Sequence, residues 1–135
     1  MKYFELVHNE CIRLNKVLDK RYRDVYFISS SQTEIIYANN NHNLIFVYAP
    51  SQYEYGNTMF LKGLRIRLDC DVEREYSLIQ VTSFLQSDCV SFSEDYKTLP
   101  LDQLMDQFDL FQNLHNNHKG WELKYKEYLK QKYPW

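Results

Sequence analysis

The chain of 135 residues carries a formal net charge of −2 at pH 7 and is 44% hydrophobic and 16% aromatic. This length favours one domain, and the apolar content excludes an intrinsically disordered chain. Because the charge is close to neutral and no basic stripe is interleaved with aromatic residues, nucleic-acid binding is disfavoured. Only three glycines and three prolines interrupt the chain, so we expect mostly regular structure.

The cysteines and the first residues indicate the compartment. Cys11, Cys70 and Cys89 are odd in number and far apart, which argues against a disulfide framework or a zinc ribbon. We expect each to be a small buried hydrophobe. Glu5 and Glu10 interrupt any signal-peptide core, and no apolar run has the length of a membrane helix. The sequence therefore predicts a cytoplasmic protein that binds no membrane.

A helix is predicted over roughly residues 2–21. Its apolar residues recur at steps of three and four and form one stripe: Phe4, Val7, Cys11, Leu14 and Leu18. Basic residues gather at its C-terminal end, where the helix dipole favours cations.

Runs rich in β-branched and aromatic residues follow and predict strands at 25–28, 33–38, 44–49 and 58–68. The segment "NNNHN" between the second and third runs includes His42. Asparagine tolerates the left-handed backbone region and bonds to nearby backbone groups, so a hairpin turn is predicted here rather than a site. The segment "PSQYEYGNT", with Tyr53 and Tyr55, predicts the next turn.

From Asp69 the pattern becomes helical. A helix is predicted near 72–87, and a second over the leucine-spaced stretch "LPLDQLMDQFDLFQNLHNNH". Helical spacing resumes at Trp121, and Gly120 either separates two helices or lies within one bent helix. The order of elements predicts a single α+β domain over residues 1–135. It has an N-terminal helix, an antiparallel meander of about four strands, and two to three C-terminal helices packed on one sheet face.

No motif in the sequence indicates a particular catalysed reaction. His115 and His118 form an HxxH pair, which lacks the spacing and the glutamate of a catalytic zinc helix, so we expect solvated histidines near a helix end. The serines lie in no GxSxG turn, and no glycine-rich phosphate loop is present in the sequence. We therefore predict that the protein is not an enzyme and uses no cofactor or metal.

Charge is unevenly distributed along the chain. Residues 1–68 hold nine lysines and arginines against six acids, residues 69–109 hold two against ten, and residues 110–135 hold five against two. On a strand the acids of "DCDVERE" would share one face, and one interpretation is a site for a divalent cation, although no EF-hand spacing is present. Two other interpretations stay open. The acids are either ordinary solvated residues or a recognition surface that steers a basic partner.

The order of segments also resembles a known group. The "EIIY" strand, the polar turn, the "LIFVY" strand and the final helices with "LPLDQLMDQFDLF" and "GW" are similar to small bacterial proteins encoded beside polymorphic toxins and treated as immunity proteins. The resemblance implies a non-enzymatic protein that binds a toxin and blocks it. It supplies no motif from which functional residues are carried over.

These observations predict a protein-binding module with a protein partner, for which a basic toxin domain is the candidate. The residues expected to contact it combine two turn tyrosines with the acids of two segments: Tyr53, Tyr55, Asp69, Asp71, Glu73, Glu75, Asp88, Glu94 and Asp95. Aromatic anchors would supply binding energy, and charge would supply speed and selectivity. Two alternatives remain: a small-molecule-binding or enzymatic α+β domain, and a homo-oligomeric adaptor or homodimer.

Overall fold

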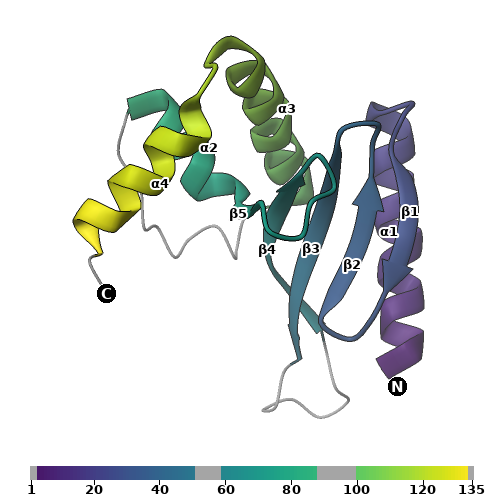
Figure 1. Cartoon of the computed structure of the whole chain (residues 1–135). Coiled ribbons are helices and arrows are strands. Elements are labelled where there is room, and N and C mark those ends of the chain that lie inside the picture. Colours follow the sequence, from purple (N-terminus) through teal and green to yellow (C-terminus); the bar gives the residue numbers. More distant parts are fainter. Residues whose placement is uncertain (1–2, 51–58, 88–99, 134–135) are drawn as a thin grey trace.

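The computed structural model of the chain describes residues 3–50, 59–87 and 100–133. Four helices and five strands lie in these ranges (Figure 1): α1 (Tyr3–Arg21), β1 (Tyr26–Ser30), β2 (Glu34–Ala38), β3 (His42–Pro50), β4 (Met59–Leu68), β5 (Glu75–Ser77), α2 (Leu78–Ser87), α3 (Leu101–Asn117) and α4 (Trp121–Lys132). The predicted α+β arrangement is confirmed, with five strands where about four were expected.

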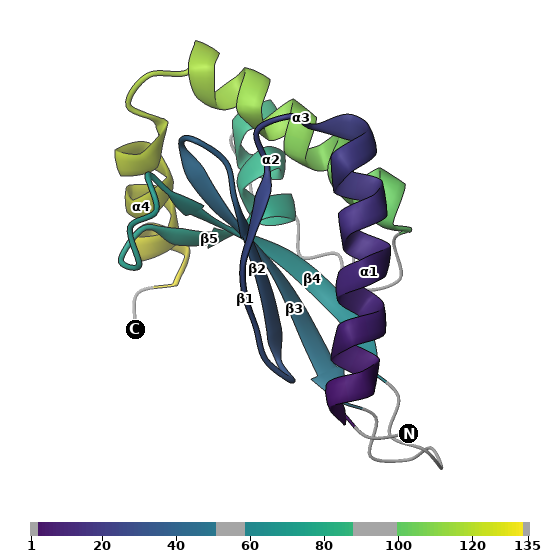
Figure 2. The same ribbon diagram turned by 90° about the vertical axis from the view of Figure 1, so that its right-hand side faces the viewer.

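The sheet is an antiparallel meander in the order β1-β2-β3-β4-β5, so β1 and β5 form its edges. Side chains of a strand alternate between the two faces. On β3, Leu44, Phe46 and Tyr48 face the core together with residues of all four helices. Figures 1 and 2 show α1 and α3 on this same side of the sheet. In the described part of the chain no helix crosses the opposite face, where Arg65 and Arg67 of β4 lie.

The turn between β2 and β3 is shorter than predicted. The Asn39 side-chain oxygen accepts the backbone N–H groups of Asn41 and His42, at 2.8 and 2.6 Å. This side-chain turn brings the chain into β3 at His42 itself. The predicted hairpin turn is therefore confirmed, but it ends before His42, which begins β3 and is only 4% exposed.

The predicted helix near 72–87 begins later, at Leu78. Asp69 and Cys70 adopt left-handed backbone angles, with φ of 52° and 57°, and reverse the chain after β4. Glu75–Ser77 then pairs with β4 as β5. A three-residue strand gives too short an alternation to be distinguished from the first turn of a helix, which is why the sequence pattern missed it.

Gly120 separates α3 from α4. Its φ of +76° lies in the left-handed region that a helix interior does not allow and that glycine adopts without strain. The C-terminal segments are therefore two helices rather than one bent helix. Trp121 and Tyr125 of α4 are buried against the core.

Candidate functional site

Only part of the residue set predicted for partner binding can be placed. Tyr53, Tyr55, Asp88, Glu94 and Asp95 lie outside the described residues. The other four carboxylates are placed by the turn between β4 and β5 and by β5. Since only Glu75 of the four belongs to a strand, they do not share one strand face.

Two of these carboxylates are engaged within the fold. Asp69 accepts a hydrogen bond from Arg74 at 2.6 Å. Glu75 bridges Arg65 and Arg67 on the open sheet face, at 3.0 and 2.8 Å. Their charge is therefore largely matched by bases of the same chain.

The remaining two, Asp71 and Glu73, are exposed. Asp71 supports the turn by accepting the Glu73 backbone N–H at 2.9 Å. Glu73 is exposed in the same turn.

The acids of α3 are also paired. Arg21, at the end of α1, donates to Asp106 at 2.8 Å and to Asp109 at 2.6 Å. Tyr22 donates to the other oxygen of Asp109 at 2.6 Å. Much of the negative charge that the sequence concentrates in residues 69–109 is therefore used to join elements.

A second polar group links β5 to α4. Arg74 donates to Glu122 at 2.8 Å, and the Tyr76 hydroxyl donates to the same carboxylate at 2.5 Å. Burial opposes ionisation of Glu122, but these hydrogen bonds outweigh it and hold its pKa below the ordinary value. The network fixes α4 against the β4–β5 turn.

His42 and His115 meet in the interior. Their ring centroids are 5.3 Å apart, and both rings contact Phe111. The Asp69 backbone N–H donates to Nδ1 of His42 at 3.3 Å, and the Trp121 indole N–H donates to Nδ1 of His115 at 2.8 Å. Because each Nδ1 accepts a hydrogen bond, both rings are neutral and carry their proton on Nε2.

Burial lowers the pKa of His42 to about 4, helped by the neighbouring His115, and burial also lowers the pKa of His115. The expectation of solvated histidines is wrong for His115, which is half-buried, and holds for His118, which is exposed. In the described part of the chain no group of three or more histidine, cysteine or acidic side chains is placed to hold a metal. We interpret the pair as part of the core.

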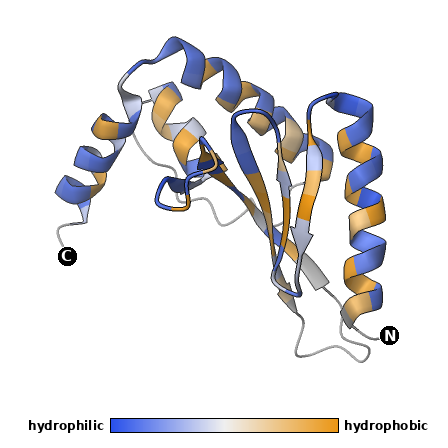
Figure 3. Cartoon of the chain, turned by 45° about the vertical axis from the view of Figure 1, so that its right-hand side comes forward, coloured by the Kyte–Doolittle hydropathy of each residue, from blue (hydrophilic) through white to orange (hydrophobic). Residues whose placement is uncertain are grey.

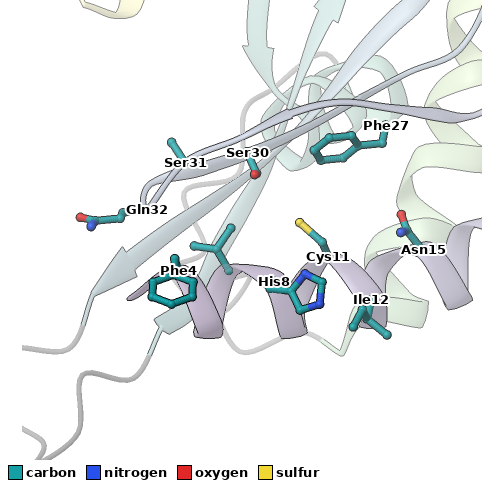
Figure 4. Close-up of a pocket in the computed structure, with 10 residues that line it drawn as sticks. Phe4, His8, Cys11, Ile12, Asn15, Phe27, Ser30, Ser31 and Gln32 are labelled. Atoms are coloured by element: carbon teal, nitrogen blue, oxygen red, sulfur yellow. The ribbon is translucent and has the colours of Figure 1, made fainter. Parts of the chain in front are cut away.

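An apolar groove lies elsewhere in the described part of the chain, between α1 and β1 (Figure 4). This groove has a volume of about 480 Å³. α1 contributes Phe4, Val7, His8, Cys11, Ile12 and Asn15, while β1 and the turn after it contribute Phe27, Ser30, Ser31 and Gln32. We call this surface the α1–β1 groove.

Three large exposed hydrophobic side chains line this groove: Phe4, Ile12 and Phe27. Among the described residues seven such side chains are exposed, and five of them belong to α1 or β1: Phe4, Ile12, Tyr26, Phe27 and Ile28. Phe4, on the stripe predicted to be buried, is 67% exposed. The hydropathy colours of Figure 3 show hydrophobic positions on both α1 and the strand beside it. Clustered exposed apolar side chains mark interaction sites, whereas isolated ones are ordinary.

The groove offers little for nucleophilic chemistry. Burial raises the pKa of the Cys11 thiol, which favours the unreactive neutral form. Cys70 is exposed in the β4–β5 turn, so the expectation of a buried residue is wrong there. Cys89 lies outside the described residues.

The sequence predicted the helix and the strand that form the groove, but it did not predict that the side chains of the strand are exposed. The run at 25–28 is apolar without alternation, a pattern typical of a strand buried on both faces. All five residues of β1 are instead exposed, because β1 is an edge strand. The sequence feature that could have predicted this exposure is an apolar run in the first strand of a meander, because that strand lies at a sheet edge.

The chain matches no protein-family model. Comparison with curated proteins and with solved structures returns no significant match either. Within the described residues, none of the helices combines the length and the apolar character needed to cross a membrane. The candidate site therefore rests on its geometry.

Proposed function

We propose that this protein is a non-enzymatic protein-binding module, and that it acts as an immunity protein that binds and blocks a toxin encoded beside it. The carrying observation is the α1–β1 groove, where Phe4, Ile12 and Phe27 are 67%, 43% and 46% exposed around one apolar hollow. Apolar and aromatic anchors that enter or line such hollows supply most of the energy of a protein interface.

The toxin-blocking part of the proposal draws on the resemblance in segment order. The geometry is compatible with it, because inhibition by binding needs a rigid scaffold and anchors but no catalytic group. α1 is anchored behind the groove, since Val7, Leu14 and Leu18 are buried in the core. On this proposal the protein would occlude the active site of the toxin or a surface beside it.

Co-purification with the product of the neighbouring gene tests the proposal. We expect a stable complex, and growth of cells that express both proteins under conditions in which the neighbouring product alone stops growth. The double substitution Phe4→Ser with Ile12→Ser is expected to weaken both results. Leu123→Ser is a matched control, because Leu123 is an exposed apolar residue (65%) on α4, away from the groove. Absence of both binding and rescue with the wild-type chain would overturn the proposal.

A further inference from the structure

We propose that the partner supplies an extended segment that adds to the sheet as a sixth strand beside β1 and places alternate apolar side chains in the α1–β1 groove. This inference rests on the proposed function, since it names how the partner binds. Addition of a strand to a sheet edge combines main-chain hydrogen bonds with pockets for every second side chain.

The β1 edge is open to such pairing. β1 is the outermost strand on its side of the sheet, and its five residues, Tyr26 to Ser30, are all exposed. Edge strands are commonly protected by lysine, proline or inward-pointing charge, and the sequence "YFISS" has none of these. The irregularity between Phe27 and Ser29 is the one protective feature, and the regular pairing resumes at Ser29 and Ser30.

The pairing of β1 with β2 determines where the backbone N–H and C=O groups of Ser30 point. The Ser31 N–H donates to the Glu34 carbonyl at 2.7 Å, which makes this the hydrogen-bonded pair of the β1–β2 hairpin. Ser30 opposes Ile35 in the next pair. Since hydrogen-bonded and non-hydrogen-bonded pairs alternate in an antiparallel ladder, the N–H and C=O of Ser30 point away from β2, toward an incoming chain.

The groove lies where the inward side chains of a sixth strand would go. Figure 2, which views the molecule from the β1 side, shows α1 beside β1 at the front of the molecule. In Figure 4 the side chains of α1 and those of β1 line the two sides of the hollow. His8 is the only titratable lining residue besides Cys11. The lining therefore fits apolar side chains, and the open backbone edge specifies that they arrive on an extended chain.

A second copy of this chain fits the edge less well. Two copies paired in an antiparallel manner through β1 are related by a twofold axis perpendicular to the sheet, so both α1 helices lie on the same side. Neighbouring strands are only about 4.8 Å apart, whereas a helix with its side chains is about 10 Å across. α1 already occupies that side at the β1 edge. The occupant is therefore a strand from another protein, without a helix behind it.

The test uses the full chain and a phage-displayed library of random peptides of about twelve residues, long enough to span a strand. Peptides selected on the wild-type chain are measured against Ser30→Pro, which removes the outward N–H, and against Ser30→Ala, which removes only the hydroxyl. We expect enriched peptides with apolar residues at alternate positions. Their Kd should rise about tenfold or more on Ser30→Pro and less than about twofold on Ser30→Ala.

A second measurement keeps the test independent of the fold of Ser30→Pro. N-methyl groups are placed at alternate backbone nitrogens of a selected peptide, in either of two registers. Strand addition predicts that one register abolishes binding and the other leaves it intact, because only one edge of the peptide pairs with β1. Equal tolerance of both registers, or no enrichment on the wild-type chain, would overturn strand addition.

A dimer of this chain in solution would also overturn the proposal, if light scattering shows it and Ser30→Pro dissociates it. The β1 edge would then pair with a second copy. Co-purification with the neighbouring gene product does not depend on any of these results. Failure of strand addition is thereby separated from failure of the proposed function.

Discussion

The imidazole rings of His42 and His115 meet edge to face, with centroids 5.3 Å apart and planes at 82°, and join the first residue of β3 to the last turn of α3. Both Nδ1 atoms accept hydrogen bonds, from the Asp69 backbone and from Trp121. These hydrogen bonds are made by the neutral form of each ring. Protonation of either ring would place a charge between Phe111 and a second imidazole.

This pair predicts a loss of stability on mild acidification. The pKa of His42 falls from 6.5 to about 4 on folding because of burial, so the unfolded chain binds more protons between these values. Stability from this group is full above pH 6.5 and decreases as the pH falls toward 4. The slope approaches about 1.4 kcal/mol per pH unit for each such histidine. Urea unfolding measured between pH 7 and pH 5 checks it.

His42→Asn is the control for this pH dependence, because the asparagine amide oxygen replaces the Nδ1 acceptor without a titratable ring. The variant is expected to have a shallower pH profile than the wild type. An unchanged profile would mean that other groups cause the acid sensitivity. Asp69, Arg74 and Glu122 are the charged groups that act on the histidine pair, and their contributions remain in the variant.

A further prediction concerns the ion pair between Arg74 and Glu122. Arg74→Met is expected to lower the free energy of unfolding by about 1 kcal/mol, since it leaves Glu122 without its main partner while partial exposure screens the loss. The side chains are 31% and 20% exposed. Lys126→Met is the matched control, because Lys126 reaches the same carboxylate only at 4.0 Å. Equal effects of the two substitutions would contradict the role given to Arg74.

The two faces of α1 predict opposite outcomes for neighbouring substitutions. Leu14 is fully buried, so Leu14→Ala should cost about 2–5 kcal/mol through lost contacts and a cavity. Ile12 is 43% exposed in the groove, so Ile12→Ala should change stability by less than about 0.5 kcal/mol. Both are measured by urea unfolding. A large loss for Ile12→Ala would show that the groove is packed in solution.

Gly120 provides a test of the break between α3 and α4. No atom lies within 4 Å of the position that a Cβ would take, so the effect of Gly120→Ala is backbone strain at φ +76° without a clash. We expect a loss of about 1 kcal/mol in unfolding free energy, and a smaller loss for Gly120→Asn, because asparagine tolerates this region. No difference between the two variants would argue against a left-handed conformation at this position.

The sequence predicted those elements in which the hydrophobic periodicity extends over many residues. The stripe of α1 and the leucine spacing of α3 extend over many turns, and both helices were confirmed. β5 was missed because three residues carry no period, and the start of α2 was placed too early for the same reason. His42 was misplaced because composition alone does not show whether Asn39 or His42 closes the turn.

The candidate site was harder to predict for a different reason. Exposure of Phe4 and Phe27 depends on where the sheet ends relative to α1, which is a property of tertiary structure. The pairing of Asp106 and Asp109 with Arg21 likewise joins residues more than eighty positions apart. Formal charge counted along the chain therefore did not show which acids remain free for a partner.

Hydrogen–deuterium exchange of the chain alone and in complex with the neighbouring gene product tests the central claim most directly. We predict that protection on binding is strongest in the N-terminal half of α1 and in β1 with the turn after it, because these segments form the α1–β1 groove. Protection confined to the acidic turn between β4 and β5, with α1 and β1 exchanging as in the free chain, would contradict it.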